Sequence, residues 1–251
     1  MSTLPRQIVI GDVHGHYDTL VRLLDSLDLK DGDRVDFLGD LIDRGPASYQ
    51  VVDLIMSHPS YYAIRGNHEE MMLSALVYGQ HDDRYFNFWL SGGGDLTLES
   101  YPNSGVMYEH LDWLESLPAY RDRGDVWLVH AGVNPHLPIA EQSSQEFCWI
   151  RDVFHRQTQP YFPDKLIIIG HTITFTFPGV RSGQLVRGCG WLGIDTGVYT
   201  LESGWLTAID VTHQQVYQAN VWQESQRSLP WDDAIISLDP NKVRRRRFAL
   251  K

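Results

Sequence analysis

Short apolar runs alternate with amphipathic stretches along the first part of the chain. Three of these runs have the length of buried strands: residues 8–10, 35–38 and 62–64. After the first run, leucines recur at the spacing of one helix face: Leu20, Leu23, Leu24 and Leu27. After the second run, Pro46 and Ser48 open a segment that predicts another helix. Strands and helices that alternate in this way predict a parallel sheet with covered faces.

The rest of the chain predicts two more helices and a second set of strands. The helices are expected at residues 69–78 and 111–117, and the segment 81–101 between them is expected to be a polar connection with a flexible turn at Gly92–Gly94. Further apolar runs follow at residues 126–129, 166–169, 191–194, 205–209 and 216–221. The last three are closely spaced, which favours an antiparallel arrangement. Two packed sheets with helices outside fit both halves of the chain.

A chain of 251 residues is long enough for one large α/β domain. We find no internal repeat and no linker that would divide it, so we predict a single domain over residues 1–240. The remaining residues, 241–251, are a basic C-terminal tail around Arg244–Arg247, and we expect this tail to be a solvated segment.

The formal charge of −11 argues against nucleic acid as a partner, since such binding needs a basic surface. It leaves a phosphorylated substrate possible, because divalent cations would invert the sign of the local charge. Cys148 and Cys189 lack the spacing of a metal site and are expected to be free thiols in a reducing compartment. The sequence shows neither a signal peptide nor a membrane span, so we expect a cytoplasmic protein that does not bind membranes.

Polar side chains directly follow five of the predicted strands. They form the sequences GDVHG at 11–15, GDLIDRG at 39–45, GNHE at 66–69, HAG at 130–132 and GHT at 170–172. Carboxylate, imidazole and amide oxygen together suit Mn, Fe or Zn better than metals that prefer thiolate. Because ligands gather at the carboxyl ends of strands in such sheets, the five segments predict one pocket with two metal ions. A hydrolase with two metals is the leading interpretation.

The five motifs, in this order, resemble the signature of the calcineurin-like metallophosphoesterases. More narrowly, they resemble the serine/threonine protein phosphatases of the PPP type in their compact bacterial and bacteriophage form. The resemblance extends from Asp12 to His171 and implies an α/β fold, an αββα sandwich of two mixed sheets flanked by helices.

The resemblance also implies two divalent metal ions, Mn²⁺ first and Fe or Zn as alternatives. It assigns Asp12, His14 and Asp40 to the first ion. It assigns Asp40, Asn67, His130 and His171 to the second ion, so that Asp40 bridges the two. A hydroxide that bridges the ions would attack the phosphorus directly, as expected for two cations that lower the pKa of water.

Four further residues match positions that handle the substrate in this family. Arg44 and Arg151 match the two arginines that bind the phosphoryl group, for which a bidentate guanidinium is suited. His68 matches the general acid, and Asp43 matches the carboxylate that orients it. Asp195 is either a partner of a metal-bound histidine or part of an ordinary turn, and the sequence leaves both open.

The resemblance implies a phosphatase that acts on phosphoserine and phosphothreonine in a phosphorylated protein or peptide, with phosphotyrosine as a further candidate substrate. The alternative is a dinucleoside polyphosphate hydrolase such as a diadenosine tetraphosphatase, which shares the scaffold. Such hydrolases typically lack an acidic residue at position 43 and have Asp after GNH, whereas this chain has Asp43 and Glu69. A third possibility is a catalytically silent binding module, which the complete set of ligands and acid argues against.

Overall fold

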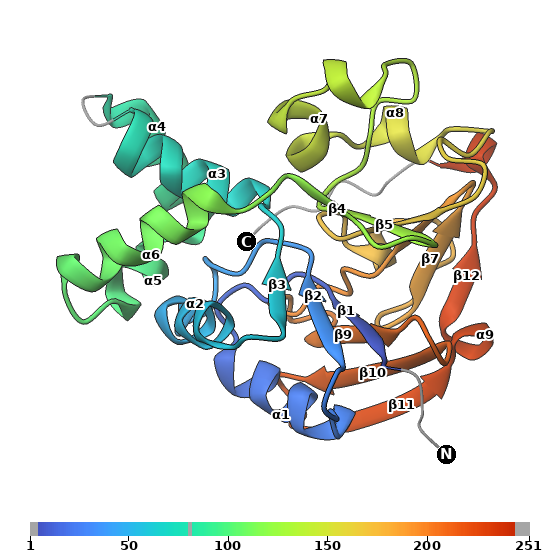
Figure 1. Ribbon diagram of the computed structural model, residues 1–251, viewed down its shortest axis with the longest axis horizontal. Helices are drawn as coiled ribbons and strands as arrows, with labels where there is room; N and C mark the ends of the chain where they lie inside the picture. The colour runs from blue at the N-terminus through green and yellow to red at the C-terminus, as the bar shows by residue number, and fades with distance from the viewer. Residues whose placement is uncertain (1–4, 80–81, 244–251) are drawn as a thin grey trace.

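The computed structural model describes residues 5–79 and 82–243, and Arg244–Arg247 of the predicted tail lie outside the described residues (Figure 1). Two six-stranded sheets form its centre. In spatial order, sheet A consists of β11 (Gln226–Pro230), β10 (Gln215–Asn220), β9 (Trp205–Asp210), β1 (Gln7–Ile10), β2 (Arg34–Phe37) and β3 (Tyr61–Ala63). Sheet B consists of β12 (Ile235–Ser237), β7 (Leu185–Gly188), β8 (Trp191–Gly193), β6 (Leu166–Ile169), β5 (Val126–Val129) and β4 (Tyr120–Asp122).

Both sheets are mixed, which confirms the predicted fold class. In sheet A, β1, β2 and β3 are parallel, whereas β9 and β10 are antiparallel as the apolar runs at 205–209 and 216–221 predict. β11, which none of the predicted runs includes, extends this antiparallel part. The run at 191–194 differs from the expectation, because the chain crosses to the other sheet between β8 and β9. In sheet B, β8 lies parallel to β6 and antiparallel to β7.

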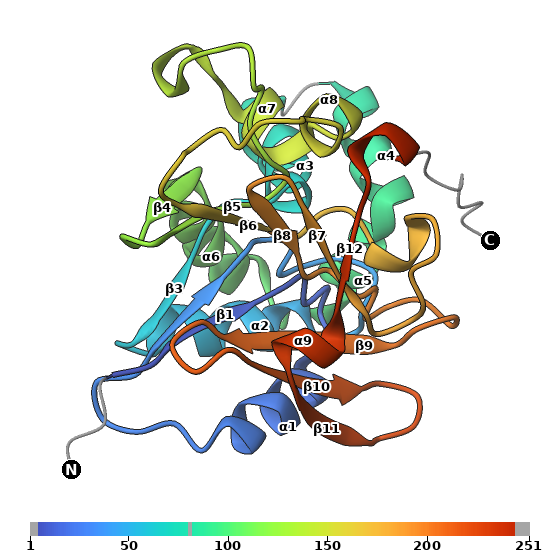
Figure 2. The same ribbon diagram turned by 90° about the vertical axis from the view of Figure 1, so that its right-hand side faces the viewer.

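Helices cover the outer face of each sheet. In chain order the helices are α1 (Tyr17–Leu27), α2 (Ser48–Ser57), α3 (Asn67–Leu73), α4 (Asp83–Trp89), α5 (Asp95–Ser100), α6 (Ser104–Ser116), α7 (Ser144–Trp149), α8 (Asp152–His155) and α9 (Trp231–Ala234). α9 is the exception to this placement, because its Trp231 and Ala234 pack in the apolar layer between the sheets. Figure 2 shows α1 below sheet A and α7 and α8 above sheet B, with the two sheets between them. None of the helices in the described part of the chain has the length and apolar character needed to cross a bilayer.

The alternation of side chains along the strands produces three apolar layers. On β1, Ile8 and Ile10 pack against the helices of sheet A, whereas Val9 points into the space between the sheets. On β6, Ile168 points into the same space and Ile167 packs under α7 and α8. Because both faces of these strands are buried, their sequences are continuously apolar instead of alternating with polar residues.

Residues 83–100 are helical, so the expected polar connection is wrong for this part of the segment. α4 and α5 are joined by a π-helical turn, Leu90–Gly94, and α3 continues into another such turn, Ser74–Tyr78. The glycines concealed the helix because glycine disfavours helical interiors. Here Gly93 has a φ of 106°, which breaks the helical path and separates α4 from α5.

An ion pair joins the two sheets and gives a first test of the fold. Asp36 on β2 is buried, and its carboxylate accepts hydrogen bonds from Nη2 of Arg123 at 2.6 Å and from Nε at 3.0 Å. Arg123→Ala leaves a buried carboxylate without its bidentate partner. We expect the free energy of unfolding to fall by about 2–3 kcal/mol in urea denaturation.

Arg84→Ala is the matched control for this variant. Arg84 also pairs with an aspartate at 2.6 Å, that of Asp82, but its side chain is 89% exposed and the pair is screened by water. We expect no measurable change in the urea midpoint for this control. Equal stability losses in the two variants would contradict the role given to the Asp36 pair.

Candidate active site

The loops that follow β1, β2, β3, β5 and β6 meet at one end of the two sheets and bring the predicted ligands together. Two groups of donor atoms form there, each within 4.8 Å: His14, Asp40 and His68, and Asp40, His130 and His171. All of these side chains are buried. Asp40 belongs to both groups, which is the placement expected of a bridging carboxylate.

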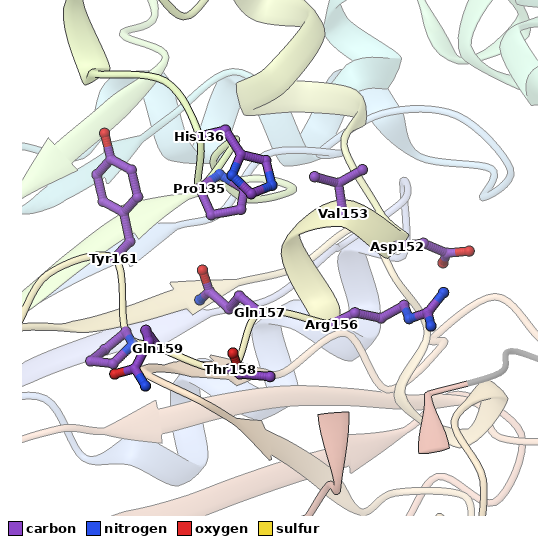
Figure 3. Close-up of a pocket in the computed structure, with 10 residues that line it drawn as sticks. Pro135, His136, Asp152, Val153, Arg156, Gln157, Thr158, Gln159 and Tyr161 are labelled. Atoms are coloured by element: carbon purple, nitrogen blue, oxygen red, sulfur yellow. The ribbon is translucent and has the colours of Figure 1, made fainter. Parts of the chain in front are cut away.

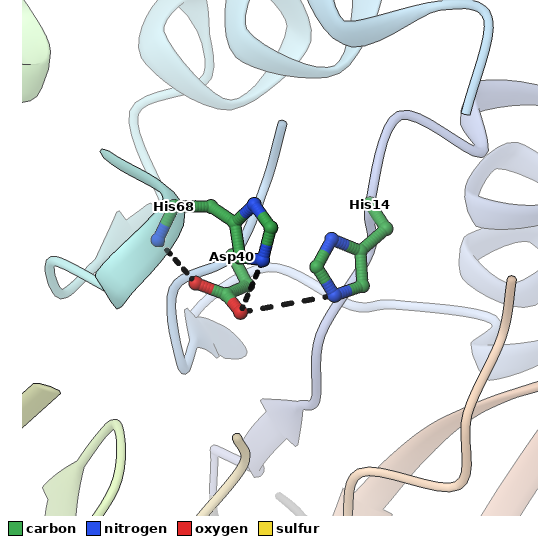
Figure 4. Close-up of side chains that lie close together, drawn as sticks. All are labelled: His14, Asp40 and His68. Carbon is green, nitrogen blue, oxygen red and sulfur yellow. Dashed lines mark hydrogen bonds and ion pairs between the residues drawn. The ribbon is translucent and has the colours of Figure 1, made fainter. Parts of the chain in front are cut away.

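The two oxygens of Asp40 face different groups. Oδ2 lies 3.7 Å from Nε2 of His14 and 3.9 Å from Nε2 of His68, as Figure 4 shows. Oδ1 lies 3.3 Å from Nε2 of His130 and also accepts the backbone N–H of His68 at 2.9 Å. The carboxylate is therefore oriented by the backbone and touches both histidine groups.

In two of these histidines, a hydrogen bond at Nδ1 leaves the other ring nitrogen, Nε2, as an acceptor that faces the site. Nδ1 of His130 donates to the carbonyl of Leu38 at 2.7 Å, and Nδ1 of His14 donates to the carbonyl of Ile42 at 3.0 Å. Burial lowers the pKa of both histidines, so the rings are neutral and Nε2 carries a lone pair. Histidines that bind metals are commonly oriented by such second hydrogen bonds.

The acceptors then converge in a way that suits a cation. Nε2 of His130 lies 3.0 Å from Oδ1 of Asn67 and 3.3 Å from Oδ1 of Asp40, so three acceptor atoms face one another. Nδ1 of His171 lies 2.7 Å from the same amide oxygen. Facing lone pairs repel unless a cation or proton lies between them. This donor set therefore fits a divalent ion.

Asp12 is at the site but outside both groups of converging atoms. Its carboxylate accepts the backbone N–H of His171 at 3.0 Å. Burial, together with the charges of Asp195 and Asp40, raises the pKa of Asp12 well above its usual range. A nearby cation would relieve this crowding of carboxylates, which agrees with the ligand role predicted for Asp12.

The backbone is strained at the predicted site. Among the described residues, eight other than glycine have a positive φ, and five of them are His14, Asp40, Asp43, Arg44 and His171. The left-handed region costs about 1–3 kcal/mol for such residues and is typically retained at functional sites. Most of the strained positions are thus residues of the motifs predicted to form the site.

Asp43 and His68 form a buried pair beside the metal-ligand groups. Nδ1 of His68 lies 2.6 Å from Oδ2 of Asp43, and both side chains are almost fully buried. The opposite ring nitrogen, Nε2, points toward Asp40. This is the arrangement predicted for a general acid and its orienting carboxylate.

Two residues that the sequence analysis did not identify hold Asp43. Nε1 of Trp89 donates to both carboxylate oxygens at 3.0 and 3.1 Å, and the hydroxyl of Thr97 donates to Oδ1 at 2.7 Å. Both residues come from the helical segment that the sequence predicted to be a loop. No local pattern marks them, because they reach Asp43 only through the packing of α4 and α5.

Arg44 is held by the glycine turn between those helices. Its backbone N–H donates to the carbonyl of Gly93 at 3.2 Å and its Nε donates to the carbonyl of Gly92 at 3.4 Å. A Cβ at position 93 would lie 2.7 Å from the backbone nitrogen of Arg44, so only glycine allows this approach. The expected flexible turn at Gly92–Gly94 is therefore wrong: the turn is a support for a residue of the site.

Arg151 reaches the site from the turn between α7 and α8, the helices over sheet B. Its Nη1 donates to the hydroxyl of Thr172 at 3.0 Å and to the carbonyl of His171 at 3.4 Å. The next residue, Asp152, begins α8 and lines a hollow of about 690 Å³ (Figure 3). None of the predicted ligands lines this hollow, so it is distinct from the metal-ligand groups.

The two acidic residues with uncertain roles both hold backbone. Oδ1 of Asp195 accepts the N–H of Gly197 at 2.9 Å, which supports the interpretation of a turn. The carboxylate of Glu69 accepts backbone N–H groups of Asp40, Leu41 and Gly66 at 2.8–2.9 Å. Glu69 thus shapes the loop that carries Asp40, and its identity says little about the substrate.

The fold and these groups define a hydrolase of the metallophosphoesterase class. Residues 5–216 match the model of the calcineurin-like phosphoesterase family, and the chain belongs to this family. The family resemblance inferred from the five motifs is thereby confirmed.

Relatives with two different activities resemble the chain. It is 35% identical over 128 residues to a symmetrical bis(5'-nucleosyl)-tetraphosphatase of Dechloromonas aromatica, a match that covers 50% of this chain and 43% of the relative. It is 40% identical over 109 residues to serine/threonine-protein phosphatase 2 of Escherichia coli, covering 42% of this chain and 45% of that relative. The matches thus span less than half the length of these curated relatives.

A solved structure shows the same fold over nearly the whole chain. A protein serine/threonine phosphatase from Saccharomyces cerevisiae superposes with a TM-score of 0.61 and 16% identity, covering 90% of this chain and 80% of the other. At this identity the likeness supports the fold alone.

Proposed function

We propose that the protein is a metal-dependent phosphatase that removes phosphate from phosphoserine and phosphothreonine in proteins. The observation that carries this proposal is the buried pair of Asp43 and His68, with Nδ1 2.6 Å from the carboxylate. The carboxylate accepts the N–H of Nδ1 and orients the ring, so that Nε2 faces the site and can deliver a proton to the leaving group.

The leaving group explains why this pair matters. Hydrolysis of an alkyl phosphate expels an alkoxide, which is a strong base and departs readily only when a proton is delivered to it. Hydrolysis of a dinucleoside polyphosphate expels a nucleotide, whose phosphate oxygen is a far weaker base. A well-held proton donor therefore favours the phosphomonoester of an aliphatic alcohol over the dinucleotide.

The other predicted residues complete the proposal. Asp12, His14 and Asp40 would hold one divalent ion, and Asp40, Asn67, His130 and His171 a second. The two ions would supply an activated water and neutralise charge on the phosphoryl oxygens. Arg44 contacts His14, and Arg151 contacts Thr172 beside His171; both arginines would bind the remaining phosphoryl oxygens. His68 would then protonate the serine or threonine oxygen as it departs, and Asp43 would keep the ring oriented.

A dinucleoside polyphosphate hydrolase is the second candidate. The likeness to the tetraphosphatase of Dechloromonas aromatica favours it, and the same metal-ligand groups would serve that reaction. The contacts of Glu69 also remove one of the two sequence arguments against it, since that residue binds backbone N–H groups. The acidic residue at position 43, Asp43, is the remaining sequence argument against a dinucleoside polyphosphate hydrolase.

The deciding experiment compares two substrates after metal removal. The protein is stripped with a chelator, Mn²⁺ is restored, and initial rates are measured for a phosphothreonine peptide and diadenosine tetraphosphate at equal concentration. We expect activity to vanish with the chelator, to return with Mn²⁺, and to favour the peptide.

Each other outcome has a definite meaning. Preference for the dinucleotide would keep the metal-dependent mechanism and replace the proposed substrate. Binding of Mn²⁺ without turnover of either compound would favour the silent binding module. Full activity in the chelator would contradict a metal-dependent enzyme of either kind.

A further inference from the structure

Tyr199 contacts two residues of the site, although no motif includes it. It lies in the loop between β8 and β9. Its ring lies 4.2 Å from Cζ of Arg44, measured to the ring centroid. The ring of His14 meets it edge to face at 4.9 Å between centroids. One side chain thus touches a predicted phosphate-binding residue and a predicted metal ligand.

The contacts of Arg44 show what the ring adds. The carbonyls of Gly92 and Gly93 hold the backbone and Nε of Arg44, and Nη1 lies 3.0 Å from Nε2 of His14. Those contacts are made by N–H groups of Arg44. The Tyr199 ring adds a contact of another kind, since Cζ of Arg44 lies over its aromatic face. A guanidinium over an aromatic face is attracted by the ring quadrupole, more strongly when water is excluded.

We propose that Tyr199 positions Arg44 to receive the phosphoryl group of the substrate, an inference that rests on the phosphate-binding role proposed for Arg44. A long, flexible side chain loses conformational entropy when it binds an anion. A ring that already restricts the guanidinium reduces this loss, so the site binds phosphate more tightly.

The test measures phosphate binding apart from turnover. The full chain is loaded with Mn²⁺, and its Kd for inorganic phosphate is measured by calorimetry, together with KM and kcat for p-nitrophenyl phosphate. For Tyr199→Leu we expect Kd and KM to rise roughly tenfold and kcat to change less. Tyr199→Phe keeps the ring and should recover most of the loss.

A double-mutant cycle shows whether the effect passes through Arg44. If it does, Tyr199→Leu should weaken phosphate binding by less than about twofold when added to Arg44→Ala. The control is Tyr62→Leu. Tyr62 lies on β3, and its ring centroid is 5.1 Å from Cζ of Arg121 and 4.8 Å from Cζ of Arg123, so the variant removes a similar contact away from the site. We expect no change in Kd for this control. Tyr199→Met, whose flexible side chain can adapt to the space but has no π face, serves if the leucine variant does not fold.

Three results would overturn the inference. The first is an unchanged Kd for phosphate in Tyr199→Leu. The second is a double variant whose loss of phosphate affinity equals the product of the losses in the two single variants. The third is the absence of any phosphate binding by the unmodified protein. Failure of the proposed function looks different. In that case the protein binds phosphate and shows the Tyr199 effect but prefers the dinucleotide to the phosphopeptide.

Discussion

His68→Asn is expected to slow hydrolysis of a phosphothreonine peptide by about 10²–10⁴-fold, the contribution typical of a general acid. The ring nitrogen Nδ1 lies 2.6 Å from Asp43, and Nε2 faces the carboxylate of Asp40 at the centre of the site. Asparagine removes the proton donor but leaves the neighbouring donor atoms of His130 and His171 in place. The measurement is kcat with saturating Mn²⁺, with metal content determined in the same samples.

The nature of the leaving group provides an internal check. p-Nitrophenolate leaves without protonation, so p-nitrophenyl phosphate should lose far less rate in His68→Asn than the peptide does. The exposed His58→Asn is the control and should behave like the unmodified protein with both substrates. Equal losses for the peptide and the aryl phosphate would mean that His68 acts through metal binding and not as an acid.

Asp40→Asn is expected to have the largest effect on metal content. Asp40 is the residue that both groups of donor atoms share, and its two oxygens lie 3.3 Å from His130 and 3.7 Å from His14. An amide cannot bridge two cations as a carboxylate does. Since bound metals supply several kcal/mol of transition-state stabilisation, we expect hydrolysis to fall roughly a thousandfold or more.

Metal content is measured by mass spectrometry after gel filtration in Mn²⁺ of limited concentration. We expect the bound metal to fall below one ion per chain in Asp40→Asn. Asp31→Asn changes an exposed carboxylate by the same single atom and is the control. Retention of full metal content by Asp40→Asn would refute the bridging role of Asp40 and the division of ligands built on it.

The sequence by itself determined the class of fold and the residues that meet at the site. Short apolar runs mark strands whose residues are buried on both faces, as Ile8, Val9 and Ile10 are. Motifs that directly follow such strands must gather at one end of the sheets, because the carboxyl ends of parallel strands share an edge. Within sheet A this brings the loops after β1, β2 and β3 together, whereas the 3.3 Å approach of Asp40 to His130 joins the two sheets and depends also on how the sheets pack.

Only the tertiary structure decided what supports those residues. Trp89 and Thr97 lie 46 and 54 positions from Asp43 in the sequence, and packing of α4 and α5 alone brings them to its carboxylate. The low helix propensity of glycine favoured a loop at Gly93, but propensity says nothing of the backbone N–H of Arg44 that the Gly93 carbonyl accepts. The contact of Tyr199 with Cζ of Arg44 likewise joins residues far apart in the sequence. Pattern in a sequence records local geometry and burial, whereas contacts between distant segments are set by how the whole core packs.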